Sequence, residues 1–228
     1  MYNKDIKTTL YYAELSALHD EELFRQYYLT LPSCRREKID RIKPEGERRR
    51  SLGAGLLLKK ACEEYGIPGE DGYLLTGEYG KPAFAARPEV QFSLSHSGEY
   101  AACVVAGCEA GCDIETVKPF RWLVAKRVFT EEECRWLSSE EEQGRGEEAF
   151  CRLWTLKESF LKATGKGFSF PVQELSFSLA EEQPAMRLYC QPDQPFTFYE
   201  LRLTENCRCA VCLHSTDASQ PAIIQMNL

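Results

Sequence analysis

Residues 150–168, FCRLWTLKESFLKATGKGF, decide how this chain is organised. Apolar side chains recur here at helical spacing and predict one buried helix face: Phe150, Leu153, Trp154 and Leu161. At about 3.6 residues per turn, Lys157 falls in the middle of that face. A lysine among apolar residues is costly unless an anion meets its ammonium group. The stretch therefore predicts a buried helix that carries a paired lysine.

Glu158 and Lys162 fall together on the flank of the same helix. Carboxylate and ammonium groups four residues apart commonly form an ordinary ion pair on an exposed helix surface. Taken alone, the helix is compatible with that structural explanation and with a chemical site. Residues outside this helix are needed to distinguish the two explanations.

The composition is typical of a globular protein without a membrane span. The 228 residues are 43% hydrophobic and 28% charged, and no apolar run approaches the ~20 residues that a membrane helix needs. The first residues, MYNKDIKTTLYYAEL, lack the apolar core of a signal peptide. We expect a cytoplasmic protein that does not bind membranes.

Positive charge is concentrated in residues 31–60, which carry ten Lys or Arg against four acids, although the whole chain has a net charge of −7. A basic patch on an acidic protein favours a compact anionic ligand over nucleic acid. A solvated basic helix is the alternative. The arginines at positions 48–50 occupy the early turns of a helix predicted from Pro44 to about Tyr65, where phosphates are often held.

The eleven cysteines are scattered. The spacing in CRCAVCLH, residues 207–214, alternates as in a strand, and no second pair at matching distance completes a zinc site. Reduced cysteines that fill the core are the favoured explanation.

The remaining sequence predicts alternating helices and strands. We expect a strand over 8–15, a helix from Asp20 to Tyr28, a hairpin over 90–107 that turns at Gly98, a strand over 111–116, and helices over 120–129 and from Thr130. Strands follow residue 168, and the last few residues look frayed. The fold class is α/β (α+β), with two similar, pseudo-two-fold related halves of about 110 residues, each a small sheet packed by helices. The boundary is placed between residues 110 and 111, and a ligand is expected between the halves.

Three acids predict a divalent cation site. Asp113 and Glu115 stand two apart on a strand, so both carboxylates point to one side. Together with Glu158 they suit Mg²⁺, which prefers a few carboxylates and ligand phosphate oxygens. Strand acids at a sheet edge have the same pattern, so the pair alone is weak.

Five segments in order carry a resemblance: GKPAF (80–84), FSLSHS (92–97), GCDIE (111–115), RVFTEEE (127–133) and LWTLKESFLKATGKG (153–167). In their order and spacing they resemble the 4′-phosphopantetheinyl transferases, in particular the larger, pseudo-dimeric type that activates peptide synthetases. The resemblance spans roughly residues 31–171. It implies transfer of phosphopantetheine from coenzyme A to a serine of an acyl or peptidyl carrier protein, with release of adenosine 3′,5′-bisphosphate.

The resemblance also implies residue roles. The metal, Mg²⁺ or alternatively Mn²⁺, would be bound by Asp113, Glu115 and Glu158. Lys162 would hold the coenzyme A diphosphate with help from Lys157. The other coenzyme A contacts would be Arg35, Lys38, Arg49, Lys81, Ser95 and His96. The enzyme is expected to be a monomer.

Transfer of this kind depends on positioning and on neutralising phosphate charge. Glu158 is the candidate base for the carrier serine, directly or through a water, and Lys162 is its catalytic partner. Glu133 is a rival base, although its capping-box position favours a structural role. Phe120, Trp122 and Leu123 suit either the core or a carrier interface, where Lys118, Arg121 and Lys126 would complement an acidic carrier. The alternative function is a non-catalytic module that binds coenzyme A or a nucleotide on the same fold.

Overall fold

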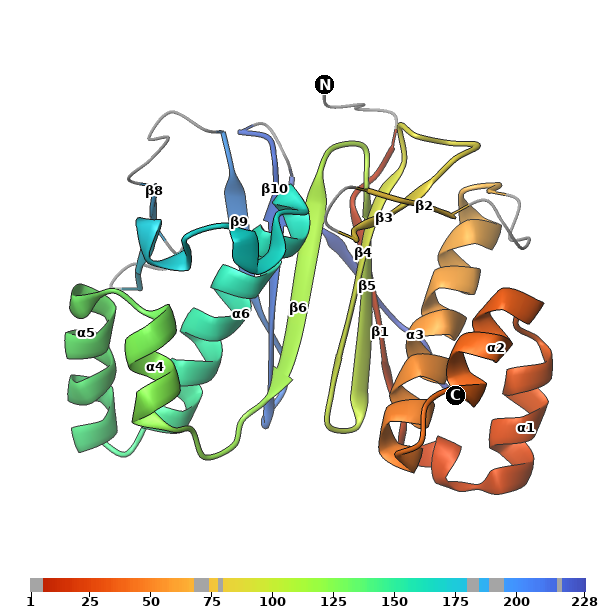
Figure 1. Cartoon of the computed structure of the whole chain (residues 1–228), viewed down its shortest axis with the longest axis horizontal. Helices are drawn as coiled ribbons and strands as arrows, with labels where there is room; N and C mark the ends of the chain where they lie inside the picture. Colours follow the sequence, from red (N-terminus) through yellow and green to blue (C-terminus); the bar gives the residue numbers. More distant parts are fainter. Residues whose placement is uncertain (1–5, 68–73, 78–79, 180–184, 189–194, 217–218) are drawn as a thin grey trace.

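A computed structural model describes most of the chain: residues 6–67, 74–77, 80–179, 185–188, 195–216 and 219–228. Two small sheets lie side by side in the middle, with α1–α3 on one flank and α4–α6 on the other (Figure 1). This is the predicted mixed α/β architecture. Among the described residues, no helix has the length and apolar character that a membrane span requires.

The helices flank the sheets in two groups. The first group is α1 (Glu21–Leu29), α2 (Ser33–Asp40) and α3 (Glu45–Glu64). The second is α4 (Trp122–Val128), α5 (Glu131–Glu142) and α6 (Gly146–Thr164). Short 3₁₀ turns occur at η1 (Ser16–His19), η2 (Gly167–Ser169) and η3 (Val172–Glu174).

The strands form two main sheets and two short hairpins. The first sheet has the order β11-β1-β5-β4, from β11 (Ala222–Gln225), β1 (Thr9–Glu14), β5 (Tyr100–Ala106) and β4 (Gln91–Ser97). The second has the order β6-β10-β9, from β6 (Ala110–Thr116), β10 (Cys207–Leu213) and β9 (Thr197–Thr204). The hairpins are β2 (Leu74–Thr76) with β3 (Pro82–Phe84), and β7 (Leu175–Ser178) with β8 (Ala185–Leu188).

Local signals in the sequence set several element boundaries. Asp20 caps α1 by accepting a hydrogen bond from the Leu23 amide at 2.8 Å. Thr130 and Glu133 form the predicted capping box of α5. Gly98 turns the hairpin between β4 and β5 with a φ of 54°, a conformation that favours glycine. These elements confirm the predictions made from capping and turn residues.

The predicted frayed C-terminus is wrong. Residues of β11 pair in parallel with β1, from Thr9 opposite Ala222 to Tyr12 opposite Gln225. The strand is only four residues long, and its partner lies more than two hundred positions earlier, so no local pattern marks it.

The division of the chain between residues 110 and 111 falls at the first residue of β6. The last strand, β11, nevertheless belongs to the sheet of the first half. A cluster of buried residues from both sheets, including Leu10, Val104, Ile114 and Val211, packs where the two sheets meet. The pseudo-two-fold relation of the halves stays a prediction.

The buried cysteines lie mainly between and beside these sheets. The ten cysteines that the structure describes are free thiols. Burial raises the pKa of several of them, to about 11 for Cys112. They act as small apolar residues in the core, as the sequence predicts.

Candidate active site

A cleft of about 890 Å³ opens between the two helical groups. It is lined from α2, α3, the loop before β3, β4, β6 and α6. Nine of the eleven side chains predicted to form the site line it: Arg35, Lys38, Lys81, Ser95, His96, Asp113, Glu115, Glu158 and Lys162. Segments distant in the sequence therefore meet at one place, as the motifs predict.

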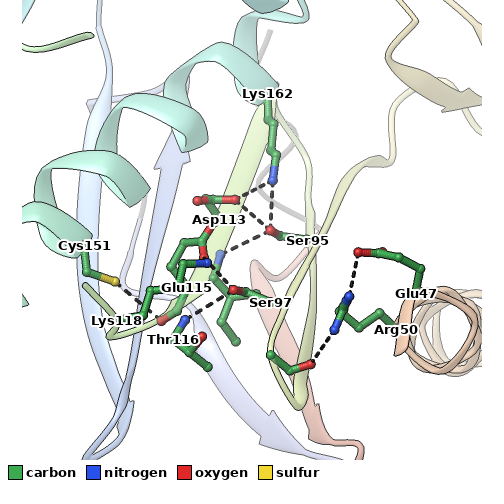
Figure 2. A network of polar contacts seen from close by, with 12 residues as sticks. Glu47, Arg50, Ser95, Ser97, Asp113, Glu115, Thr116, Lys118, Cys151 and Lys162 are labelled. Atoms are coloured by element: carbon green, nitrogen blue, oxygen red, sulfur yellow. Dashed lines mark hydrogen bonds and ion pairs between the residues drawn. The ribbon is translucent and has the colours of Figure 1, made fainter. Parts of the chain in front are cut away.

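Asp113 lies on the floor of the cleft and is only 4% exposed. Its Oδ1 atom accepts hydrogen bonds from Lys162 Nζ at 2.6 Å and from Ser95 Oγ at 2.7 Å (Figure 2). Its Oδ2 atom is buried and has no hydrogen-bond partner among the described residues. Burial raises the pKa of Asp113, and the charge of Lys162 partly offsets this rise. An unpartnered buried carboxylate oxygen needs a cation or a donor that is supplied from outside.

Glu158 and Lys162 extend from α6 over the same floor. Burial, together with the negative charge of Asp113, raises the pKa of Glu158 to about 7. For Lys162, burial lowers the pKa, but attraction to Asp113 outweighs it and the pKa is raised. At neutral pH the site thus holds a charged lysine and a glutamate that readily exchanges a proton.

Gly111 allows α6 to approach β6 closely enough to build this site. A Cβ atom at position 111 would lie 2.0 Å from the carbonyl oxygen of Ser159 and 2.4 Å from the amide nitrogen of Ala163. No side chain fits there without moving the helix away from the strand. The glycine two residues before Asp113 therefore sets the distance between the strand acids, Asp113 and Glu115, and the side chains of α6.

Positive side chains form the opposite wall of the cleft. Arg35 donates to the Ser51 carbonyl oxygen at 3.2 Å, and its buried Nε has no partner among the described residues. Lys38 also lines the cleft, as does His96, whose pKa is lowered by burial, so that its ring is neutral at neutral pH and contributes a hydrogen-bonding group rather than a charge. Burial, and then the charge of Arg35, lowers the pKa of Lys38. Such a wall is suited to an anion because each cation gains a partner when the anion binds.

Lys81 lines the cleft, but its ammonium group already has partners. It donates to the carbonyl oxygens of Ala163, at 2.7 Å, and Ala110, at 3.2 Å. These carbonyls belong to the end of α6 and the start of β6. Lys81 therefore joins the two elements that carry the acids, and its predicted contact with coenzyme A stays a prediction.

Lys157 lies outside the cleft, which corrects its predicted contact with the diphosphate. Its side chain is 1% exposed, and its Nζ pairs with Glu133 at 2.8 Å and donates to the carbonyl oxygens of Val172 and Leu175. The anion that this buried lysine requires is thus a glutamate of α5. Glu133 also accepts from the amides of Thr130 and Phe177, so it has a structural role and cannot reach a substrate hydroxyl.

Arg49 is also outside the cleft, which corrects a second assignment. It lines a separate groove of about 470 Å³ with residues of α1, and its guanidinium lies 3.9 Å from Glu45. The α3 side chains that face the cleft are instead Glu47, Ser51, Ala54 and Leu58. Counting from Gly53 placed the arginine on the wrong side of the helix.

Ser97 also belongs to the site, although no sequence pattern predicted it there. Ser97 Oγ donates to Glu115 Oε2 at 2.5 Å, as Ser95 does to Asp113 (Figure 2). The alternation of serines at 93, 95 and 97 was a signal that these side chains share one face, but not that the face lies against acids of another strand.

A ready-made metal site is absent from the described part of the chain: no three histidine, cysteine or carboxylate groups are close enough to hold an ion. Lys162 occupies one oxygen of Asp113, and the strand acids repel Glu158. The three predicted ligands line the same cleft but are not in coordinating geometry in this structure.

Comparison with known proteins identifies the family. The family model described as the 4′-phosphopantetheinyl transferase superfamily matches residues 109–212. The 4′-phosphopantetheinyl transferase gsp of Aneurinibacillus migulanus is 34% identical, covering 78% of this chain and 73% of that protein.

Two further proteins and one solved structure are also similar to parts of this chain. The 4′-phosphopantetheinyl transferase Sfp of Bacillus subtilis is 33% identical over 65% of this chain and 66% of its own. The human L-aminoadipate-semialdehyde dehydrogenase-phosphopantetheinyl transferase is 27% identical over 81% of this chain and 67% of its own. The holo-[acyl-carrier-protein] synthase of Thermotoga maritima matches in structure with a TM-score of 0.40 at 18% identity, over 47% of this chain and 63% of that one. The chain therefore belongs to the 4′-phosphopantetheinyl transferases and is an enzyme of that activity.

Proposed function

We propose that this enzyme transfers 4′-phosphopantetheine from coenzyme A to a serine of an apo acyl or peptidyl carrier protein, in a Mg²⁺-dependent reaction that releases adenosine 3′,5′-bisphosphate. The observation that carries the proposal is Asp113, which lies beside Lys162 and Glu158 and whose buried Oδ2 has no hydrogen-bond partner in the described part of the chain. The lining residues of the cleft come from both halves of this chain, and the monomeric state stays a prediction.

The donor is expected to lie along the positive wall of the cleft. Coenzyme A carries three phosphates, and the cleft presents Arg35, Lys38, His96 and Lys162. Lys162 is the cation nearest the strand acids, which supports placing the diphosphate there.

Asp113, Glu115 and Glu158 have the chemistry that a divalent cation requires, because all three are carboxylates that line one cleft and the Oδ2 atom of Asp113 has no hydrogen-bond donor among the described residues. When bound with the diphosphate, Mg²⁺ or Mn²⁺ would neutralise phosphate charge and orient the donor. The like-charged acids would be held together by the same ion.

In the transfer, the carrier serine Oγ forms a bond to the β-phosphorus of coenzyme A. The bond from that phosphorus to the bridging oxygen breaks, and the electron pair leaves with adenosine 3′,5′-bisphosphate. Glu158 takes the serine proton, directly or through a water, because its carboxylate lines the cleft beside Lys162 and the strand acids. Lys162 offsets the charge on the departing phosphate.

The carrier is expected to dock next to the cleft. A second pocket of about 260 Å³ shares Glu115 and Trp154 with the cleft and is lined by Phe120 and Arg121. Beside it, Leu123 is 74% exposed. Apolar side chains here could contact the carrier, and the positive charges of Lys118, Arg121 and Lys126 around them would complement an acidic carrier surface.

The test is to incubate the purified protein with coenzyme A, Mg²⁺ and a panel of apo carrier proteins, and to measure carrier mass. We expect the mass of the carrier to rise by one phosphopantetheine. The Asp113→Ala variant should produce no such gain, whereas the Arg49→Ala variant should produce the same gain as wild type. Binding of coenzyme A without a mass gain on any carrier would favour the non-catalytic module. Failure of both binding and transfer would refute the proposal.

A further inference from the structure

The two main sheets are joined at the site by serine side chains. β4 pairs through its backbone with β5, and β6 pairs with β10. Between β4 and β6, the hydroxyls of Ser95 and Ser97, here called the serine pair, bridge to the strand acids (Figure 2). The serine pair therefore lies where the two halves of the molecule meet.

Ser95 uses its full hydrogen-bonding capacity at this junction. Its Oγ accepts from Lys162 Nζ at 2.9 Å and from the Ile114 amide at 3.2 Å, and it donates to Asp113 Oδ1 at 2.7 Å. One donor and two acceptor positions are all that a hydroxyl offers. Because Lys162 also binds Oδ1, both donors hold the same oxygen of Asp113, and Oδ2 has no partner among the residues that the structure describes.

Ser97 repeats the arrangement two residues later. Its Oγ accepts from the Thr116 amide at 3.4 Å and donates to Glu115 Oε2 at 2.5 Å. Lys118 Nζ lies 3.3 Å from that same oxygen. The donors again gather on one carboxylate oxygen of the acid.

Contacts from α3 fix the turn that follows Ser97. Arg50 donates to the Gly98 carbonyl oxygen at 3.2 Å and pairs with Glu47 at 2.6 Å. A Cβ atom at position 98 would lie 2.6 Å from Thr116 Cγ2. The turn is thus held against β6, which limits how far Ser97 can move from Glu115.

We propose that Ser95 and Ser97 are positioning residues that orient the strand acids so that one oxygen of each acid is free for a single divalent cation. The inference rests on the cation of the proposed function. A hydroxyl that binds one carboxylate oxygen fixes the rotation of that carboxylate and presents the other oxygen in a set direction. Ser95 would then orient the carboxylate of Asp113 in addition to lining the cleft.

The test measures Mn²⁺ binding by electron paramagnetic resonance, without coenzyme A or carrier. We expect Ser95→Ala and Ser97→Ala each to weaken Mn²⁺ binding by about 10- to 100-fold, the usual effect of removing a group that orients a metal ligand. Ser97→Thr keeps the hydroxyl and should restore binding. Asp113→Ala should remove the site.

Ser176→Ala is the matched control, because Ser176 is a buried strand serine, 5% exposed, that bonds Thr130 away from the cleft. It should retain wild-type Mn²⁺ affinity. Thermal unfolding of each variant identifies loss of fold, and only variants that unfold cooperatively enter the comparison. If both single alanine variants fail to fold, Ser97→Cys, whose thiol is a weaker donor, provides the test and should bind Mn²⁺ more weakly than wild type.

The inference is overturned if folded serine variants bind Mn²⁺ as tightly as wild type, or if the wild-type protein binds no Mn²⁺. These outcomes are separate from the carrier assay. Transfer by wild type with unchanged Mn²⁺ affinity in the variants would refute the serine role alone. Weakened Mn²⁺ binding without transfer to any carrier would refute the proposed function and leave the serine role standing.

Discussion

Glu158→Gln is expected to stabilise the metal-free protein above neutral pH while it removes activity. The pKa of Glu158 rises from 4.5 to about 7 because of burial and the charge of Asp113. Between these values the folded protein holds a proton that the unfolded chain has lost. The wild-type free energy of unfolding therefore falls as the pH rises through this window and stays low above it.

The size of the effect follows from the shift. At roughly 1.4 kcal/mol per pKa unit, the upper limit is about 3 kcal/mol, and the partial exposure of the side chain reduces it to about 1–3 kcal/mol. Glutamine resembles the protonated acid and carries no such pH dependence. The stability difference between Glu158→Gln and wild type should thus be small near the acid end of the window and largest above pH 7.

Urea unfolding in the presence of a chelator, at about pH 5 and about pH 8, measures the difference. Glu147, an exposed residue of the same helix, provides the control, and Glu147→Gln should gain no stability between the two conditions. Excess Mg²⁺ should reverse the order, because a cation that binds only the folded state stabilises the variant with the intact site. The reasoning is refuted if Glu158→Gln is no more stable than wild type at the higher pH, or if the gap does not change with pH.

Three further predictions concern the packing and the walls of the cleft. Lys157→Met should destabilise the fold by about 3–5 kcal/mol, measured by urea unfolding, because it leaves a buried glutamate without its cation. A wild-type unfolding midpoint would contradict this. Arg35→Ala should raise the KM for coenzyme A in steady-state assays, whereas Arg49→Ala should not, because only Arg35 lines the cleft; equal effects would show that the donor reaches both. Gly111→Ala should greatly lower the melting temperature, since its Cβ would lie 2.0 Å from a backbone oxygen of α6, and an unchanged melting temperature would show that the helix can shift at no cost.

Much of the secondary structure could be predicted because its signals are local. The Asp20 cap, the capping box at Thr130 and the turn at Gly98 each depend on residues within a few positions of one another. The strand β11 could not be predicted, because its only support is a partner at the opposite end of the chain.

The candidate site likewise has features that the sequence predicted and features that depend on the tertiary structure. The side chains of β4, β6 and α6 that the motifs predicted all line one cleft. Position along a motif did not show which way a side chain points on a long helix. Arg49 faces another groove for this reason, and Lys157 turns toward α5 although its neighbour Glu158 faces the cleft.

The sequence by itself determined the family, a helix within residues 150–168 that has a lysine in its buried face, and the two acids on one side of a strand. The tertiary structure decided the partners: Glu133 for Lys157, Lys162 and Ser95 for Asp113, and Ser97 for Glu115. The physical reason is the separation along the chain over which each effect acts. Periodicity and capping act over a few residues, whereas the cost of burying a charge is met by whatever group the fold brings beside it, at any separation along the chain.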